Sequence, residues 1–172
     1  MKKSTEKLNI KSQKLNGKAK TKKFFTVSPL ETENVAKVLA RAVLETQLAK
    51  SARVIALVGE LGSGKTTFTQ GFAKGLGVRE KILSPTFILM RRYELKTKNY
   101  KLKTRYFYHI DCYRLDNPVK ELLYLGFKKI LADPGNIVAV EWADRIKRIL
   151  PKDVLWVHFK NMAENQRSIT IE

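Results

Sequence analysis

The stretch Gly59-Glu60-Leu61-Gly62-Ser63-Gly64-Lys65-Thr66 has the pattern G-x-x-x-x-G-K-[ST], which is typical of the phosphate-binding loop of nucleoside triphosphatases. Its glycines remove Cβ atoms and allow the left-handed dihedrals that turn backbone N–H groups toward a triphosphate. Lys65 supplies a positive charge for the β and γ oxygens, and Thr66 supplies a hydroxyl suited to Mg²⁺. We expect nucleotide contacts from Glu60, Leu61, Gly62, Ser63, Gly64, Lys65, Thr66 and Thr67.

The sequence on either side of this loop supports the interpretation, because a buried strand should precede the loop and a helix should follow it. Residues 54–58 form a continuous apolar run of strand length. Apolar residues then recur at helical spacing from Phe68 to Leu76, and Gly77 stands where the helix should end. The N-terminus of this helix points its partial positive charge at the phosphates. A glycine-rich turn without a ligand is the alternative, and it would need neither flanking element.

Length and composition predict one domain with a core of its own, since the chain has 172 residues and 44% of them are hydrophobic. No apolar run approaches the roughly 18 residues of a membrane-spanning helix. The lysine-rich N-terminus lacks the apolar region of a secretory signal. Cys112 is the single cysteine, so an intrachain disulfide is excluded. These features together favour a cytoplasmic protein.

The net charge of +18 is distributed unevenly along the chain. Residues 1–23 hold nine Lys and one Glu with few apolar residues, so we expect a basic disordered extension before a folded domain at residues 24–172. Residues 91–105 hold seven Lys or Arg and one Glu, and we interpret them as a hairpin tip or exposed loop. The alternative for both segments is contact with a polyanion such as RNA.

Strand and helix patterns alternate along the rest of the chain. Ser28-Pro29-Leu30-Glu31 has the capping box of a helix start, and the apolar pattern predicts a helix to about Lys50. Further helices are expected at residues 65–76, 117–125 and 143–150, a short turn near 127–131, and strands at 23–27, 54–58, 105–110, 137–140, 154–159 and 168–171. The alternation predicts an α/β fold, a P-loop NTPase-like three-layer sandwich with a mixed, largely parallel central sheet.

Residues 137–141 are four apolar residues followed by an acid, which is the form of a Walker B strand. Such a strand would deliver Glu141 to the carboxyl edge of the sheet, beside the phosphate loop. Protein-bound Mg²⁺ typically takes one hydroxyl and one carboxylate from the protein. We therefore expect Thr66 and Glu141 to hold the metal, and the alternative is a surface glutamate at a strand end.

A second β-prone run ends in His109-Ile110-Asp111, which places another acid at the same expected edge. We expect Asp111 to orient the attacking water or to support Mg²⁺. If the strand persists, His109 and Asp111 point the same way, and a structural hydrogen bond between them is the alternative to a chemical role for His109.

Two further residues bear on the terminal phosphate. Thr86 follows Ser84-Pro85 and is a candidate switch threonine that senses the γ-phosphate. Arg114 follows Asp111 by three residues, and on strand geometry we expect it on the opposite side. No arginine is therefore placed by a motif at the γ-phosphate, which predicts slow hydrolysis by the chain alone.

Taken together, these motifs resemble the TsaE (YjeE) family, the ATPase of bacterial tRNA threonylcarbamoyladenosine synthesis. The resemblance covers about residues 26–172 and rests on residues 59–66, 84–87, 109–115, 121–126 and 141–142. It implies binding of ATP and Mg²⁺, with the family's functional threonine, aspartate and glutamate at Thr66, Asp111 and Glu141. Ser63 stands where the family usually has Ala, and this departure does not touch the expected chemistry.

The resemblance also implies partners. These are TsaD and TsaB, which transfer threonylcarbamoyl from its adenylate to the adenosine beside the anticodon, while the ATPase serves turnover of the complex. Residues 1–23 and 91–105 lie outside the family's core pattern, and a contact with tRNA is one interpretation of their charge. The competing functions are a small-molecule kinase, for which we find no arginine-rich lid, and a nucleotide switch that binds nucleic acid.

Overall fold

The computed structural model describes residues 10–12, 21–46, 50–80, 82, 89–95 and 106–172. The strands are β1 (Ile10–Ser12), β2 (Lys22–Thr26), β3 (Arg53–Val58), β4 (Met90–Glu94), β5 (Tyr106–Asp111), β6 (Asn136–Glu141), β7 (Leu155–Ala163) and β8 (Gln166–Ile171). The helices are α1 (Pro29–Glu45), α2 (Lys65–Leu76), α3 (Pro118–Tyr124), α4 (Phe127–Ala132) and the 3₁₀ helix η1 (Ala143–Ile149).

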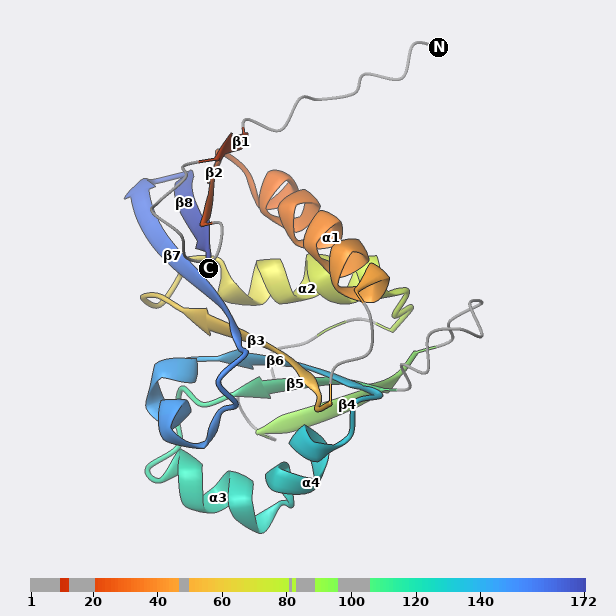
Figure 1. Ribbon diagram of the computed structural model, residues 1–172. Coiled ribbons are helices and arrows are strands. Elements are labelled where there is room, and N and C mark those ends of the chain that lie inside the picture. Colours follow the sequence, from red (N-terminus) through yellow and green to blue (C-terminus); the bar gives the residue numbers. More distant parts are fainter. Residues whose placement is uncertain (1–9, 13–20, 47–49, 81, 83–88, 96–105) are drawn as a thin grey trace.

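The strands form one mixed sheet in the order β1-β2-β8-β7-β3-β6-β5-β4 (Figure 1). The four middle strands, β7-β3-β6-β5, are parallel neighbours, whereas the pairs toward both edges are antiparallel. Strands β3, β5 and β6 therefore end at the same edge of the sheet, where the loop after β3 also begins.

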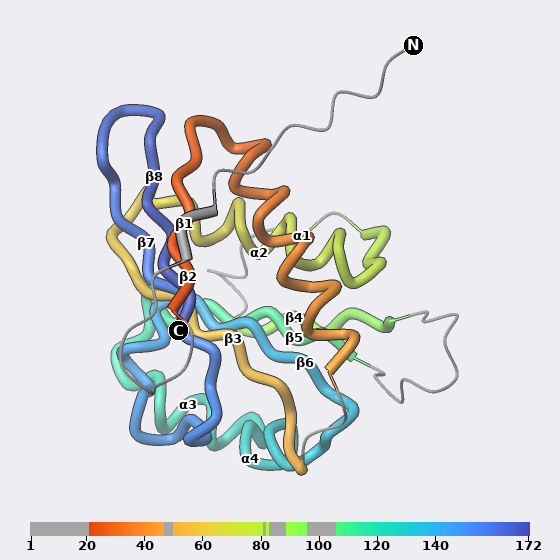
Figure 2. Tube along the Cα trace, turned by 45° about the horizontal axis from the view of Figure 1, so that its top comes forward, coloured from red at the N-terminus to blue at the C-terminus, as the bar shows by residue number. Residues whose placement is uncertain are grey.

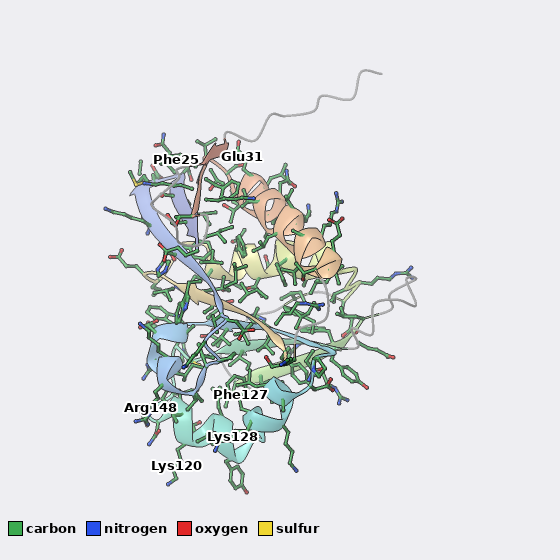
Figure 3. All side chains as sticks on the ribbon, viewed as in Figure 1. Phe25, Glu31, Lys120, Phe127, Lys128 and Arg148 are labelled. Carbon is green, nitrogen blue, oxygen red and sulfur yellow. The ribbon has the colours of Figure 1, made fainter. Side chains whose placement is uncertain are left out.

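Helices cover both faces of this sheet, so the three-layer α/β fold is confirmed. Helices α1 and α2 lie on one face, and α3, α4 and η1 lie on the other (Figure 1, Figure 2). Side chains of β3 alternate between two buried clusters, with Ile55 and Leu57 under α1 and α2 and with Val54 and Ala56 on the opposite face. In the layer formed by α3, α4 and η1, Phe127 is buried, whereas Lys120, Lys128 and Arg148 extend outward (Figure 3).

Helix α1 begins as its capping box predicts and packs unusually close to α2. Ser28 Oγ accepts a hydrogen bond from the Glu31 amide at 3.2 Å, and the helix ends at Glu45. A Cβ atom at Gly71 of α2 would lie 2.5 Å from the Glu33 Cα atom. The backbones of the two helices thus touch, and α2 is held in place directly behind the phosphate loop.

The N-terminal segment departs from the expectation of disorder over residues 1–23. Residues 10–12 form β1, which pairs antiparallel with β2, and β2 itself starts at Lys22. The physical reason is that β2 would otherwise be an edge strand with unpaired N–H and C=O groups, which β1 satisfies. Residues 1–9 and 13–20 lie outside the described residues.

Three other local expectations are corrected. The basic segment 91–105 begins as a strand, because residues 91–94 belong to β4 and Tyr93 stacks on Phe107 with ring centroids 6.0 Å apart. Residues 96–105 lie outside the described part. The expected turn near residue 127 is helix α4, and the helix over residues 143–150 is a 3₁₀ helix. None of the helices in the described part of the chain has the length and hydropathy of a membrane span.

Candidate functional site

The loop between β3 and α2 has the turned backbone that its glycines predict. Gly62 and Gly64 take φ angles of 74° and 98°, which is the left-handed region that favours glycine. At Gly59 a Cβ atom would lie only 2.7 Å from the Phe159 carbonyl oxygen, so the loop passes directly against β7. Helix α2 starts at Lys65, directly after Gly64, so the loop leads straight into its N-terminus.

Lys65 is folded back over its own loop. Its ammonium donates to the carbonyls of Gly59 and Glu60 at 2.7 and 2.8 Å and lies 4.1 Å from the centre of the Trp142 ring. The side chain is only 4% exposed. Burial lowers the pKa of Lys65, while the negative charges of Glu141 and Asp111 act in the opposite direction. An anion that entered here would compete with the loop carbonyls for the ammonium.

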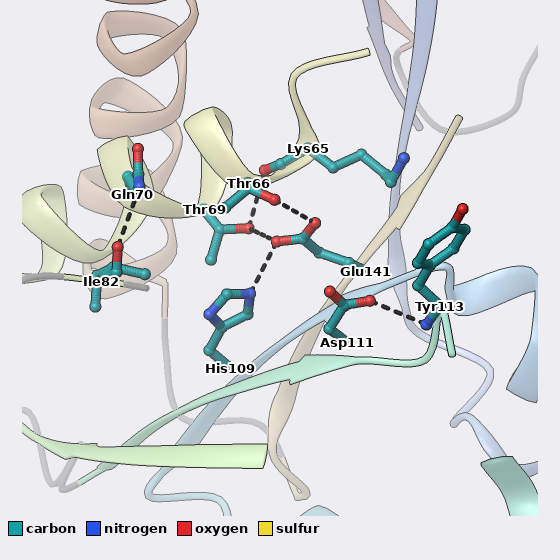
Figure 4. A network of polar contacts seen from close by, with 9 residues as sticks. All are labelled: Lys65, Thr66, Thr69, Gln70, Ile82, His109, Asp111, Tyr113 and Glu141. Atoms are coloured by element: carbon teal, nitrogen blue, oxygen red, sulfur yellow. Dashed lines mark hydrogen bonds and ion pairs between the residues drawn. The ribbon is translucent and has the colours of Figure 1, made fainter. Parts of the chain in front are cut away.

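Glu141 lies at the centre of a buried polar network at the end of β6 (Figure 4). Its Oε2 atom accepts from the Thr66 hydroxyl at 2.8 Å, and its Oε1 atom accepts from His109 Nε2 at 2.8 Å. The Thr69 hydroxyl lies 3.3 Å from Oε1 and 3.0 Å from the Lys65 carbonyl, and its one hydrogen serves one of them at a time. Glu141 is only 2% exposed. Thr66 and Glu141, which the motifs predict as a pair, therefore meet side by side.

The His109 contact corrects the structural alternative of a His109–Asp111 hydrogen bond. The register pairs His109 with Ala139 and Asp111 with Glu141 across the parallel strands β5 and β6. Residues two apart on one strand are separated by about 7 Å along it. The Glu141 carboxylate on the neighbouring strand is within reach of His109, and the imidazole turns to it instead.

Asp111 ends β5 at the same edge of the sheet and is 6% exposed. Its Oδ1 atom accepts from the Tyr113 amide at 3.0 Å, which starts the turn that follows the strand. Thr86, the candidate switch threonine, lies outside the described residues, as do Ser84 and Pro85. Its role stays a prediction.

A pocket of about 300 Å³ opens between the loop and the ends of β5 and β6. One wall is the loop and the start of α2, with Leu61, Gly62, Gly64, Lys65, Thr66 and Thr67. The other wall carries Asp111, Tyr113, Arg114, Glu141 and Trp142. The other two residues expected to contact nucleotide, Glu60 and Ser63, contact Lys65. The Glu60 carbonyl accepts a hydrogen bond from the Lys65 ammonium, and the buried Ser63 hydroxyl lies 3.5 Å from it.

Arg114 corrects the expectation that it lies on the side opposite Asp111. The strand ends at Asp111, and the chain turns at residues 113–114, so Arg114 comes back to line the pocket beside Asp111. Strand alternation no longer applies after the turn begins, so the spacing of Asp111 and Arg114 predicted the wrong side for Arg114. Trp142 belongs to the Glu141-Trp142 pair of the family resemblance, but the sequence predicts no site contact for its side chain, which stacks on Tyr113 with ring centroids 4.9 Å apart. The adjacent Glu141-Trp142 pair is the signal that points to it.

The donor set at this pocket suits a hard cation that keeps most of its water. Among the residues that the structure describes, no group of three or more His, Cys, Asp or Glu side chains is placed to hold a metal. The Thr66 hydroxyl and the Glu141 carboxylate are oxygen donors, and Mg²⁺ in phosphate sites takes one or two such ligands beside waters and phosphate oxygens.

A family model described as "Threonylcarbamoyl adenosine biosynthesis protein TsaE" matches residues 26–169 of this chain. The chain belongs to the TsaE family. The TsaE protein of Bacillus subtilis (strain 168) is 36% identical over 148 residues, which are 86% of this chain and 83% of the relative. The TsaE protein of Rickettsia felis is also 36% identical, over 142 residues that cover 82% of this chain and 74% of the relative.

A solved structure agrees with this assignment. The crystal structure of Bacillus subtilis YdiB matches with a TM-score of 0.64 and 31% sequence identity, covering 94% of this chain and 85% of that one. The resemblance to the TsaE family that the motifs suggest is therefore confirmed, and the family's role is tRNA threonylcarbamoyladenosine biosynthesis.

Proposed function

We propose that this member of the TsaE family is a Mg²⁺-dependent ATPase, an accessory subunit in threonylcarbamoyladenosine modification of tRNA that drives turnover of a TsaB–TsaD complex in the cytoplasm. The observation that carries the proposal is the 2.8 Å contact between the Thr66 hydroxyl and the Glu141 carboxylate, inside a pocket that also holds the Lys65 ammonium. A hydroxyl, a carboxylate and an ammonium converging on a glycine-rich loop match the needs of a metal-bound triphosphate.

Binding would begin at the loop. Its N–H groups and the N-terminus of α2 receive the phosphate oxygens, and Lys65 exchanges the Gly59 and Glu60 carbonyls for them. When bound, Mg²⁺ would neutralise part of the negative charge of the triphosphate. Thr66 and Glu141 would hold the ion, and His109 orients the Glu141 carboxylate from behind.

The opposite wall of the pocket would act in hydrolysis. Asp111 and Arg114 line the same wall, and Asp111 would orient a water molecule toward the terminal phosphate. A cation there would stabilise the negative charge that spreads over the terminal phosphoryl group in the transition state. The Lys65 ammonium, however, is bound by loop carbonyls, and this supports slow hydrolysis until partners and nucleotide reorganise the site.

The nucleoside end of ATP would leave the loop on its other side. A second pocket of about 90 Å³ shares Gly62, Gly64 and Thr67 with the larger one. Its remaining lining residues come from the start of α1 and from the β7–β8 hairpin, namely Ser28, Pro29, Thr32, Asn165 and Arg167. We propose this pocket for part of the nucleoside because it adjoins the phosphate pocket across Gly62, Gly64 and Thr67.

Phosphate release from saturating Mg²⁺-ATP, measured with and without TsaB and TsaD, tests the proposed function. We expect slow release by the chain alone, faster release with both partners, and tighter assembly in a non-hydrolysable ATP analogue than in ADP, by linkage. If the partners change neither rate nor nucleotide preference, the partner-gated ATPase is wrong. Transfer of phosphate to a small acceptor would favour a kinase. Stimulation by tRNA alone would favour a nucleic-acid switch, with residues 1–23 and 91–105 as the proposed contacts.

A further inference from the structure

The Arg145 guanidinium donates hydrogen bonds to three backbone carbonyls of the turn that follows β5. Its Nη1 atom donates to the Tyr113 carbonyl at 2.7 Å and also to the Cys112 carbonyl, and its Nη2 atom donates to the Leu115 carbonyl at 2.6 Å. One guanidinium thus binds three carbonyls of residues 112–115. Arg114, whose side chain lines the phosphate pocket, lies between the bound carbonyls.

The position of Arg145 follows from the start of η1. This helix begins directly after Trp142, and its Ala143 and Ile146 side chains are fully buried, which fixes its rotation. A 3₁₀ helix has three residues per turn, so Arg145 lies on a different side from these two and remains exposed. Because β5 and β6 are neighbours, the helix after β6 starts beside the turn after β5.

The turn is held from two directions. Its amide side is held by Asp111, which accepts from the Tyr113 amide, and the Tyr113 ring stacks on Trp142. Its carbonyl side is held by Arg145. A planar guanidinium presents several donors in a rigid fork, which is the geometry that binding three nearby carbonyls requires, whereas a lysine ammonium is a single point.

We propose that Arg145 is a positioning residue that fixes Tyr113 and Arg114 in the wall of the phosphate pocket. It thereby sets the preference for a triphosphate over a diphosphate and the rate of hydrolysis. This inference rests on the proposed function for the identity of the nucleotide. In the proposed binding mode the loop and the start of α2 would hold the phosphates nearest the nucleoside, and the turn bearing Arg114, which lines the pocket, would face the terminal phosphate. Loss of Arg145 should therefore affect ATP and leave ADP unchanged.

The first test needs no nucleotide. Hydrogen exchange is measured on the full chain for Arg145→Ala and for a matched control, Arg148→Ala, which removes the same charge from the exposed face of the same helix. We expect the Tyr113 amide, which donates to Asp111, to exchange about tenfold faster in Arg145→Ala, because charge-assisted bonds that order the turn are lost. The control should match the wild type. Equal exchange in all three proteins would overturn the proposal.

The second test separates binding from turnover. With partners present, Arg145→Ala should lower kcat by about 10- to 100-fold through misplacement of Arg114, whereas its affinity for ADP stays at the wild-type value. Arg145→Lys keeps the charge but should recover only part of the rate. Equal losses for ADP and for the ATP analogue, or the same loss in Arg148→Ala, would contradict the proposal. If the wild type itself fails to bind ATP, the proposed function fails, and the exchange comparison still decides whether Arg145 orders the turn.

Discussion

Replacing Glu141 by Gln should separate its structural role from its role toward the metal. In the wild type, Oε1 accepts from His109 and Oε2 accepts from Thr66. A glutamine of the same shape can keep its carbonyl oxygen toward His109, and its amide can donate to the Thr66 hydroxyl, which then accepts. Every contact remains satisfied and only the negative charge is lost.

The magnitudes follow from this geometry. We expect Glu141→Gln to cost less than about 1 kcal/mol of folding free energy, or at most about 2–4 °C in Tm for a chain of this size. Glu141→Ala instead leaves the Nε2 atom of the fully buried His109 without its hydrogen-bond partner. We expect this to lower the folding free energy by about 1–3 kcal/mol and Tm by about 2–12 °C. Both variants should weaken Mg²⁺-ATP binding by at least the roughly 10- to 100-fold that loss of a residue supporting a metal ligand costs.

Thermal melts and calorimetric titration of ATP, in Mg²⁺ and in EDTA, measure both effects. Glu141→Gln should melt close to the wild type, lose affinity in Mg²⁺ and keep its weaker affinity in EDTA. Wild-type affinity of Glu141→Gln in Mg²⁺ would refute the metal role. An equal loss in both buffers would show that the carboxylate acts on the fold of the loop instead.

The remaining predictions concern three other positions. Asp111→Asn can still accept from the Tyr113 amide, so nucleotide should bind while phosphate release falls by about 10²–10⁴-fold; wild-type release would exclude Asp111 from the chemistry. Burial raises the pKa of the Cys112 thiol to about 12, so a thiol reagent at pH 8 should label the unfolded chain quickly and the native chain slowly. The unfolded thiol ionises near its usual pKa of 9.0 and the folded one does not, so this group's contribution to stability should decline from pH 9 toward 12, and a flat profile in a comparison with Cys112→Ala would contradict it. Gly71→Ala should cost about 1–3 kcal/mol, because its Cβ atom would meet the α1 backbone at Glu33, and an unchanged Tm would show that the helices can separate freely.

The sequence predicts those parts of the site that depend on a single element. The glycine pattern predicts the turned loop, and the apolar run before Glu141 predicts a buried strand that ends in an acid at the sheet edge. Thr66 and Glu141 could be paired in advance because both motifs have a fixed place relative to their own strand. The overall α/β architecture follows in the same way from the alternation of strand and helix patterns.

The parts that sequence reasoning missed depend on two elements at once. His109 contacts Glu141 because β5 and β6 are neighbours in a particular register, which one strand's pattern does not contain. Arg114 reaches the pocket because the chain turns immediately after Asp111, where strand alternation ends. Strand β1 forms because the edge of β2 is open, and three residues are too few to show a pattern.

The most direct test of the account is a calorimetric titration of ATP into the full chain in Mg²⁺, beside Lys65→Ala. Lys65 carries the only charge that the phosphate-loop motif itself supplies, and in the structure it is held at the pocket by the Gly59 and Glu60 carbonyls. We expect saturable, single-site binding by the wild type and no measurable binding by Lys65→Ala, which should still melt cooperatively. Equal affinities in the two proteins, or no binding by the wild type, would contradict it.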